Sequence, residues 1–200
     1  MQPEPSAWPR AVFWWIDAVG GYRVFLEPPV TIGQMGAGAE LELMANVSAR
    51  HAELRWGVGG AVLTAREDAA VNGKPGNTFL LRDRDKIKLR DVEFNYRRPI
   101  AWSSTGVLSL ASRHRMPLAL DGIVLMGETC VVGDRADAHI RSRWTPPVTL
   151  QRQADGLWVF APGAFQVDGE PARDRAKLTP RSEVRGSWGS FRFEPAAPSG

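Results

Sequence analysis

The sequence predicts an all-β protein made of two tandem β-sandwiches. Short apolar or alternating runs, separated by glycine and proline turn signals, occur along the whole chain. No window of useful length shows the apolar recurrence at every third or fourth residue that indicates a helix. The second half also repeats the pattern of the first. With 200 residues, the chain is long enough for each half to bury a core of its own.

The expected strands of the first half follow one another between turn signals. They are "VFWWI" (12–16), "YRVFL" (22–26), "VTIG" (30–33), "HAELRW" (51–56), "AVLTA" (61–65), "KIKLR" (86–90) and "VEFNY" (92–96). In residues 51–56 the alternation places Ala52, Leu54 and Trp56 on one face and the polar residues His51, Glu53 and Arg55 on the other. Many short strands of this kind are typical of a sandwich.

The repeat aligns without gaps over long segments. Residues 60–73 match 156–169, residues 81–94 match 178–191, and Gly33 matches Gly133. The offset changes only where loops are expected, which favours two copies of one β-module. We therefore predict one module at residues 1–100 and a second at residues 101–200. The segment that joins them, "RRPIAWSSTG" (97–106), is short, so we expect the modules to pack on each other.

The composition is that of an ordinary soluble globular protein, with 44% hydrophobic and 24% charged residues. The formal net charge is only +3, from 25 basic and 22 acidic residues, and neither half is strongly basic. A nucleic-acid partner is therefore not expected. The lone cysteine, Cys130, cannot form an internal disulfide and is expected to be a buried apolar residue.

The first ten residues, "MQPEPSAWPR", lack the basic region of a signal peptide. No apolar run approaches the ~20 residues that a membrane-spanning helix needs. We therefore expect a cytoplasmic protein without a membrane partner. Arginine, alanine, glycine and proline are plentiful and lysine is rare, which favours a GC-rich bacterial genome.

Catalysis and metal binding are not expected. Ser48 and His51 stand three apart in "VSARHAEL", but the chain has no Gly-x-Ser-x-Gly elbow to present a nucleophile. None of the histidines His51, His114 and His139 has metal-ligand spacing to another histidine or to the cysteine. Phosphate-loop and dinucleotide motifs are also absent, so we predict no enzyme activity and no cofactor.

Phosphate binding suits the same segment better. The Ser48 hydroxyl, neighbouring backbone N–H groups and Arg50 can converge on one anion through charge-assisted hydrogen bonds. Modules that bind phosphorylated peptides use such groups.

In order along the chain, "VTIG", "VSARHAEL", "VNG" and "LRDRDKIKLRDVEF" together resemble the forkhead-associated (FHA) domain over roughly residues 12–98. Residues 107–195 resemble a degenerate second copy. The resemblance implies a β-sandwich whose loops at one end bind phosphothreonine in a partner protein. It also implies that Ser48 contacts the phosphate and that His51 mainly braces the loops.

Two positions depart from the family pattern. The family's phosphate-binding arginine directly follows the glycine that matches Gly33, and here that position is Gln34. The family's binding-loop asparagine also lacks a clear match. Asn72 and Gly73 form a two-residue hairpin signal, and their spacing places them at a later hairpin. The alternative, in which Asn72 is the binding asparagine, would leave the chain without that hairpin.

The binding loop would then be "AREDA", which offers Arg66 beside Glu67 and Asp68. Two carboxylates next to a phosphate repel it. In the second module Gly133 is followed by Asp134, and Trp144 to Pro147 stand where Ser48 to His51 stood. The nearby arginines Arg135, Arg141 and Arg143 could form a basic surface.

Loss of the arginine and the asparagine would cost ~3–6 kcal/mol of binding free energy, or ~10²- to 10⁴-fold in affinity. We therefore predict a protein-interaction module that binds a protein partner with weak or lost phosphothreonine dependence. The alternatives are a true phosphothreonine-peptide binder in bacterial Ser/Thr-kinase signalling, a nucleic-acid-binding β-module, and a structural subunit without a ligand. The sequence leaves the oligomeric state open.

Overall fold

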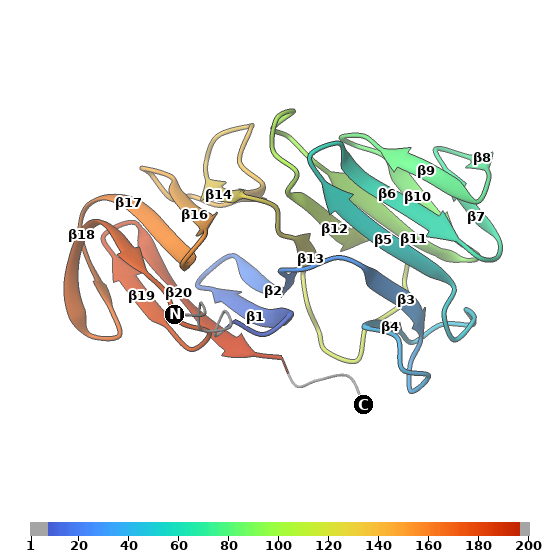
Figure 1. Cartoon of the computed structure of the whole chain (residues 1–200), viewed down its shortest axis with the longest axis horizontal. Coiled ribbons are helices and arrows are strands. Elements are labelled where there is room, and N and C mark those ends of the chain that lie inside the picture. The colour runs from blue at the N-terminus through green and yellow to red at the C-terminus, as the bar shows by residue number, and fades with distance from the viewer. Residues whose placement is uncertain (1–7, 197–200) are drawn as a thin grey trace.

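The computed structural model describes residues 8–196, and this part of the chain forms strands and no helix (Figure 1). The all-β prediction is therefore confirmed. No helix within this range is available to cross a membrane. Residues 1–7, which carry most of the segment compared with a signal peptide, lie outside the described residues.

The strands begin and end near the turn signals. Those of the first half are β1 (Ala11–Ile16), β2 (Gly20–Phe25), β3 (Val30–Gln34), β4 (Leu41–Leu43), β5 (Ala52–Gly57), β6 (Gly60–Ala65), β7 (Ala69–Val71), β8 (Lys74–Pro75), β9 (Thr78–Leu81), β10 (Lys86–Leu89) and β11 (Val92–Arg97). Those of the second half are β12 (Gly106–Leu110), β13 (Gly122–Leu125), β14 (Thr129–Gly133), β15 (Ile140–Arg141), β16 (Val148–Gln153), β17 (Gly156–Val167), β18 (Glu170–Lys177), β19 (Glu183–Gly186) and β20 (Gly189–Pro195).

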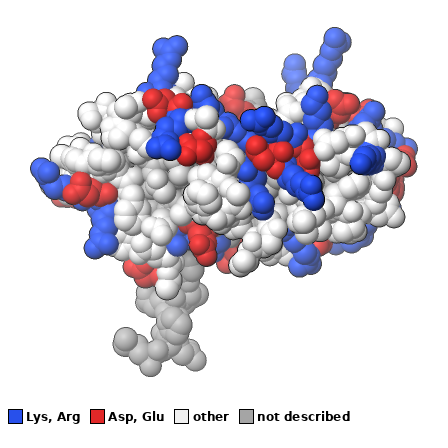
Figure 2. All heavy atoms as spheres, turned by 90° about the horizontal axis from the view of Figure 1, so that it is seen from above, with Lys and Arg blue, Asp and Glu red and all other residues white. Residues whose placement is uncertain are grey.

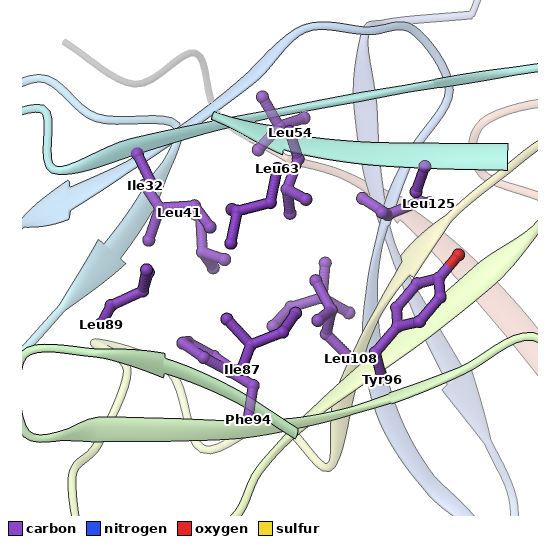
Figure 3. Packing of buried hydrophobic residues seen from close by; sticks show 14 of the residues in the cluster. Ile32, Leu41, Leu54, Leu63, Ile87, Leu89, Phe94, Tyr96, Leu108 and Leu125 are labelled. Atoms are coloured by element: carbon purple, nitrogen blue, oxygen red, sulfur yellow. The ribbon is translucent and has the colours of Figure 1, made fainter. Parts of the chain in front are cut away.

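A five-stranded sheet in the order β4-β3-β5-β6-β9 forms one layer of the first half. Strands β7, β10, β11 and β12 of a larger sheet form the facing layer. Leu54 and Leu63 of the small sheet point toward Ile87 and Phe94 of the large one, and all four side chains are buried (Figure 3). The first half is thus a β-sandwich.

The larger sheet has 15 strands and runs through both halves of the chain. Its order is β15-β14-β16-β17-β19-β20-β1-β2-β13-β12-β11-β10-β7-β8, with β18 paired to β17. The two halves meet where β2 pairs in parallel with β13, with Val24 opposite Val124. They are therefore joined by backbone hydrogen bonds as well as by the connecting segment.

The strand order shows that the two halves exchange hairpins. The first hairpin, β1–β2, pairs through β1 with the last strand, and Trp14 lies opposite Phe193. The hairpin that opens the second half, β12–β13, pairs through β12 with β11, and Leu108 lies opposite Tyr96. Each half therefore supplies two strands to the sheet of the other.

The two hydrophobic cores reflect this exchange. The first core, made mostly by strands of the first half, includes Leu108 and Ile123 from the exchanged hairpin. The second core includes Val12, Trp14 and Tyr22 from the N-terminal hairpin. Each core is completed by side chains from the other half. The module boundaries at 1–100 and 101–200 stay a prediction, to which the structure adds these shared strands.

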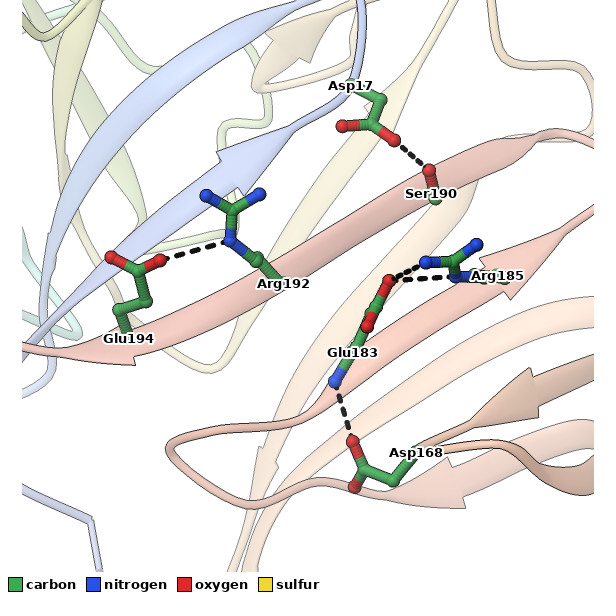
Figure 4. A network of polar contacts seen from close by, with 7 residues as sticks. All are labelled: Asp17, Asp168, Glu183, Arg185, Ser190, Arg192 and Glu194. Carbon is green, nitrogen blue, oxygen red and sulfur yellow. Dashed lines mark hydrogen bonds and ion pairs between the residues drawn. The ribbon is translucent and has the colours of Figure 1, made fainter.

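One turn geometry occurs in both halves. The Asn72 side-chain oxygen accepts a hydrogen bond from the Lys86 backbone N–H at 2.9 Å. The Asp168 carboxylate accepts one from the Glu183 N–H at 2.7 Å (Figure 4). Both turn residues have a positive φ, 51° and 55°. This recurrence is the geometry that two copies of one module would have.

The halves differ where β17 continues without a break. Its first part pairs with β16 and its last part with β19, across an irregularity between Ala161 and Ala164. At the matching place in the first half, the chain leaves β6 and forms a loop at residues 66–68 before β7. The second half therefore lacks this loop.

Candidate functional site

The candidate site lies in the segment between β4 and β5, which packs against the end of β3. Gly33 makes this possible, because a Cβ atom at that position would lie 1.9 Å from the Ala49 carbonyl oxygen. The Gln34 N–H donates a hydrogen bond to the Ser48 carbonyl at 3.1 Å. A side chain in place of Gly33 would push this segment away from β3.

His51 connects this segment to the loop at residues 66–68. Its ring is fully buried, and Nδ1 accepts a hydrogen bond from the Ser48 N–H at 3.4 Å. Nε2 lies 3.1 Å from the Asp68 carbonyl oxygen, to which it donates in the matching tautomer. The Arg66 N–H donates to the His51 carbonyl at 2.9 Å. The backbone is thus fixed at three points.

Polar side chains extend from this fixed backbone. Ser48 is half-buried, and its hydroxyl makes no hydrogen bond to another described residue. Arg50 and Arg66 are exposed, and neither guanidinium forms an ion pair within residues 8–196. A hydroxyl and two unpaired guanidinium groups can receive an anion through charge-assisted hydrogen bonds.

The candidate site formed by Gln34, residues 48–51 and residues 66–68, called the corner below, also contains groups that weaken its attraction for anions. Gln34 is exposed and uncharged at the end of β3. Glu67 and Asp68 are exposed in the same loop as Arg66. The formal charges of Glu67 and Asp68 offset those of Arg50 and Arg66.

Asn72 and Gly73 lie outside this cluster. They form the β7–β8 turn, at the other end of β7 from Asp68, with φ values of 51° and 77°. The predicted hairpin is therefore confirmed. The Asn72 amide donates to the Asp85 carboxylate at 2.7 Å, so its side chain already has partners within the fold.

The sequence did not indicate Arg90, which joins the site from the β10–β11 turn. Its N–H donates to the Asp68 carbonyl at 2.9 Å, and its guanidinium donates to the Asn46 carbonyl at 3.3 Å. Its spacing from the motif carries no signal, because the contact depends on how the two loops fold over each other.

The exchanged hairpin also contributes to this end of the sandwich. Its connecting segment, residues 111–121, forms a bridge between Arg115 and Met44, with a hydrogen bond of 2.8 Å. The Nε2 atom of His114 lies 3.3 Å from the Asp91 carboxylate. Its Nδ1 atom shares a hydrogen bond of 2.9 Å with the Ser112 hydroxyl. Residues from beyond position 100 therefore border the first-half site, which sequence reasoning confined to the first module.

The matching corner of the second half has a different chemistry. Asp134 follows Gly133, and its carboxylate accepts a hydrogen bond from the Thr145 hydroxyl at 2.9 Å. Pro147 packs where a Cβ on Gly133 would lie, at 2.7 Å, and Trp144 is buried. A carboxylate at this corner opposes phosphate binding. Arg135 pairs with Asp137 at 3.0 Å, so its guanidinium already has a carboxylate partner.

Cys130 is fully buried, and burial raises the pKa of its thiol. A thiol that stays protonated is a poor nucleophile and a poor metal ligand, so this residue serves packing. Within residues 8–196, no three residues among His, Cys, Asp and Glu are grouped to hold a metal ion.

Comparison with known proteins places these features in a family. Neither the family models nor the curated proteins contain a match to the chain. The solved "Rv0020c_FHA Structure" is 32% identical, with a TM-score of 0.34, and the match covers 44% of this chain and 91% of that one. This part of the chain is an FHA-like domain.

Two further FHA structures match to the same extent. One comes from an analysis of phosphothreonine-dependent FHA domain interactions, with 32% identity over 42% of this chain and a TM-score of 0.33. The other is the FhaA FHA domain complexed with the intracellular domain of Rv3910, with 31% identity over 41% of this chain and a TM-score of 0.31. Each covers less than half of the chain, so they account for one FHA-like domain.

Proposed function

We propose that this chain is an FHA-type protein-interaction module that binds a protein partner with weak phosphothreonine dependence. The solved FHA domains support the interaction role, since one is described in phosphothreonine-dependent interactions and another in complex with a protein domain. The binding surface is the first-half corner at Ser48, Arg50 and Arg66.

One observation carries the proposal: the frame of the corner is intact while its main cation is missing. The Ala49 carbonyl packs against Gly33, which has no side chain to block it. The His51 ring forms hydrogen bonds with the Ser48 N–H and the Asp68 carbonyl. Gln34 stands where the family pattern has its phosphate-binding arginine. A shaped surface without that cation suits a protein ligand whose affinity depends little on phosphate.

A second candidate is a true phosphothreonine binder in bacterial Ser/Thr-kinase signalling. The unpaired guanidinium groups of Arg50 and Arg66 favour it, because either could replace the missing arginine. Glu67 and Asp68 oppose it, because they put two negative charges in the same loop as Arg66.

A nucleic-acid-binding role has less support. It needs exposed stacking aromatics on a basic face, but Trp14 and Trp56 are buried. On the face that Figure 2 shows, basic and acidic side chains lie side by side. A cytoplasmic setting stays a prediction from the sequence.

The test is fluorescence polarisation with a degenerate phosphothreonine peptide library and its unphosphorylated twin. We expect both libraries to bind. The affinity for the phosphorylated library should be less than ~10-fold higher, since the phosphate adds only about one charged hydrogen bond. Ser48→Ala should reduce that preference, and Ser187→Ala, an exposed serine in the second half, should not. A preference above ~100-fold would instead establish the phosphothreonine binder, and no binding of either library would refute both candidates.

A further inference from the structure

A groove of about 870 Å³ opens between three segments that lie far apart in the chain. The β1–β2 turn (17–19) forms one side, residues 141–144 form another, and the β19–β20 turn (188–190) closes it. It exists because the N-terminal hairpin is added to the sheet of the second half. It is open to solvent along its length, so an extended ligand can lie in it without being enclosed.

Two tryptophans form the floor of the groove. The rings of Trp144 and Trp188 have centroids 4.8 Å apart. Trp144 packs on Gly189 and Trp188 packs on Gly186, where added Cβ atoms would lie 2.3 Å and 2.5 Å from the indoles. Trp144 is 5% exposed and Trp188 is 7% exposed. The floor is therefore fixed before any ligand arrives.

The wall formed by residues 141–144 is cationic. Arg141 and Arg143 are exposed, line the groove, and form no ion pair within the described part of the chain. A third arginine adds to this positive region: burial lowers the pKa of Arg97, and the nearby charge of Arg141 lowers it further. The Arg97 guanidinium is held there by the Ala136 carbonyl, at 2.7 Å.

The opposite wall holds one carboxylate, and that carboxylate has partners. Asp17 accepts a hydrogen bond from the Ser190 hydroxyl (Figure 4). The Asp17 N–H also donates to the Ser190 carbonyl at 3.1 Å. The groove therefore presents two unpaired guanidinium groups against one hydrogen-bonded carboxylate, above an aromatic floor.

We propose that this groove binds an acidic peptide segment of a protein partner. Carboxylate side chains of the segment pair with Arg141 and Arg143, because a guanidinium presents its donors in the geometry that a carboxylate accepts. An apolar side chain of the segment lies against the edges of Trp144 and Trp188. The site is separate from the corner at Ser48 and does not depend on phosphate.

The test uses a fluorescein-labelled peptide with a run of glutamates around one phenylalanine, titrated with the whole protein. We expect the double variant Arg141→Gln/Arg143→Gln to bind ~10- to 100-fold more weakly, because two charge-assisted contacts are lost. The matched control is Arg173→Gln/Arg181→Gln, which removes the same charge from exposed, unpaired positions outside the groove. Its affinity should equal that of the wild type.

Three results would overturn the proposal. They are no binding by the wild type, equal weakening in both double variants, and tighter binding of a single-stranded DNA oligonucleotide that competes with the peptide. The Ser48→Ala variant separates this site from the proposed function. Binding that persists in Ser48→Ala supports the groove, whereas binding lost there belongs to the first-half corner. Thermal unfolding of every variant checks that the fold is kept.

Discussion

The imidazole of His51 bridges two backbone groups of different loops, the Ser48 N–H at 3.4 Å and the Asp68 carbonyl at 3.1 Å. Replacing the ring by the methyl group of alanine would remove the acceptor of the Ser48 N–H and one of the two donors to the Asp68 carbonyl, which keeps the Arg90 N–H, and would open a cavity. We expect His51→Ala to lower the free energy of unfolding by about 2–4 kcal/mol. Urea unfolding measures this change directly. His114→Ala, a partly exposed histidine at the rim, should cost less than about 1 kcal/mol; an equal loss in both variants would contradict the bridging role.

The second prediction follows from the close approach of Ala49 to Gly33. A Cβ at residue 33 would lie 1.9 Å from the Ala49 carbonyl, so Gly33→Ala must displace residues 47–51. We expect faster amide hydrogen exchange in that segment, since its hydrogen bonds to β3 and to His51 are disturbed. The control is Gly57→Ala, where a Cβ meets no atom within 4 Å. Unchanged exchange in Gly33→Ala would show that the segment adapts without cost.

Local patterns were sufficient for the longer strands of the first half and for one face of its sandwich, but they did not indicate the short strands β4, β7, β8 and β9. Ala52, Leu54 and Trp56 are buried as the alternation predicts. His51 was expected on the polar face with Glu53 and is instead fully buried, just before β5 begins. Its two ring nitrogens both find backbone partners, which is the condition under which a polar side chain can be buried. The alternation rule does not contain that information.

The exchange of hairpins could not be predicted from the sequence, for a different reason. The hairpins β1–β2 and β12–β13 have the same short apolar strands, so either could complete either core. Local signals define a strand but not its neighbour, and here the neighbour is set by the parallel pairing of Val24 with Val124. The contact of residues 111–121 with the site depends on this arrangement and was missed with it. The contacts of Arg90 were missed because they depend on how two loops of the first half fold over each other.

The third prediction concerns the missing cation. Gln34→Arg should restore a guanidinium beside Ser48, on the frame that Gly33 and His51 maintain. We expect the preference for phosphothreonine over threonine peptides to rise ~10-fold or more, the value of one added charged hydrogen bond. Met35→Arg adds the same charge one residue later, at a side chain that is 48% exposed. A similar rise in both variants would mean that general charge, and not the corner, attracts the phosphate.

The fourth prediction is a loss of stability in mild acid that comes from His139. Burial, together with the nearby charge of Arg97, lowers the pKa of this imidazole to about 4. Its Nδ1 accepts a hydrogen bond from the Val131 N–H at 3.1 Å, so the neutral form is the one that fits. In the unfolded chain the group takes up a proton near pH 6.5, and in the folded chain only near pH 4.

The unfolded state therefore binds more protons between these values, and stability falls as the pH falls from about 6.5 to about 4. The full loss from this one group is on the order of 3 kcal/mol. His139→Gln keeps an acceptor for Val131 but does not titrate, so its free energy of unfolding should vary less over that range. Denaturant titrations at several pH values provide the comparison, and parallel curves for the two proteins would count against His139 as the source.

The last prediction follows from the exchanged hairpins. Trp102 is 91% exposed in the segment that joins the halves, so a protease site engineered between Ala101 and Trp102 should be cleaved in the folded protein. The cut leaves β1 paired with β20 and β12 paired with β11. We expect the two fragments to elute together from a sizing column and to separate only in denaturant.

Each fragment expressed alone should be unfolded, because Leu108 and Ile123 belong to the first core while Val12 and Trp14 belong to the second. Mixing the denatured fragments and removing the denaturant should restore the folded complex, as circular dichroism and the sizing column would show. Two modules that merely packed side by side would behave differently: each fragment would fold by itself and the nicked protein could come apart. Independent folding of either fragment would therefore show that the other half's hairpin is dispensable to its core.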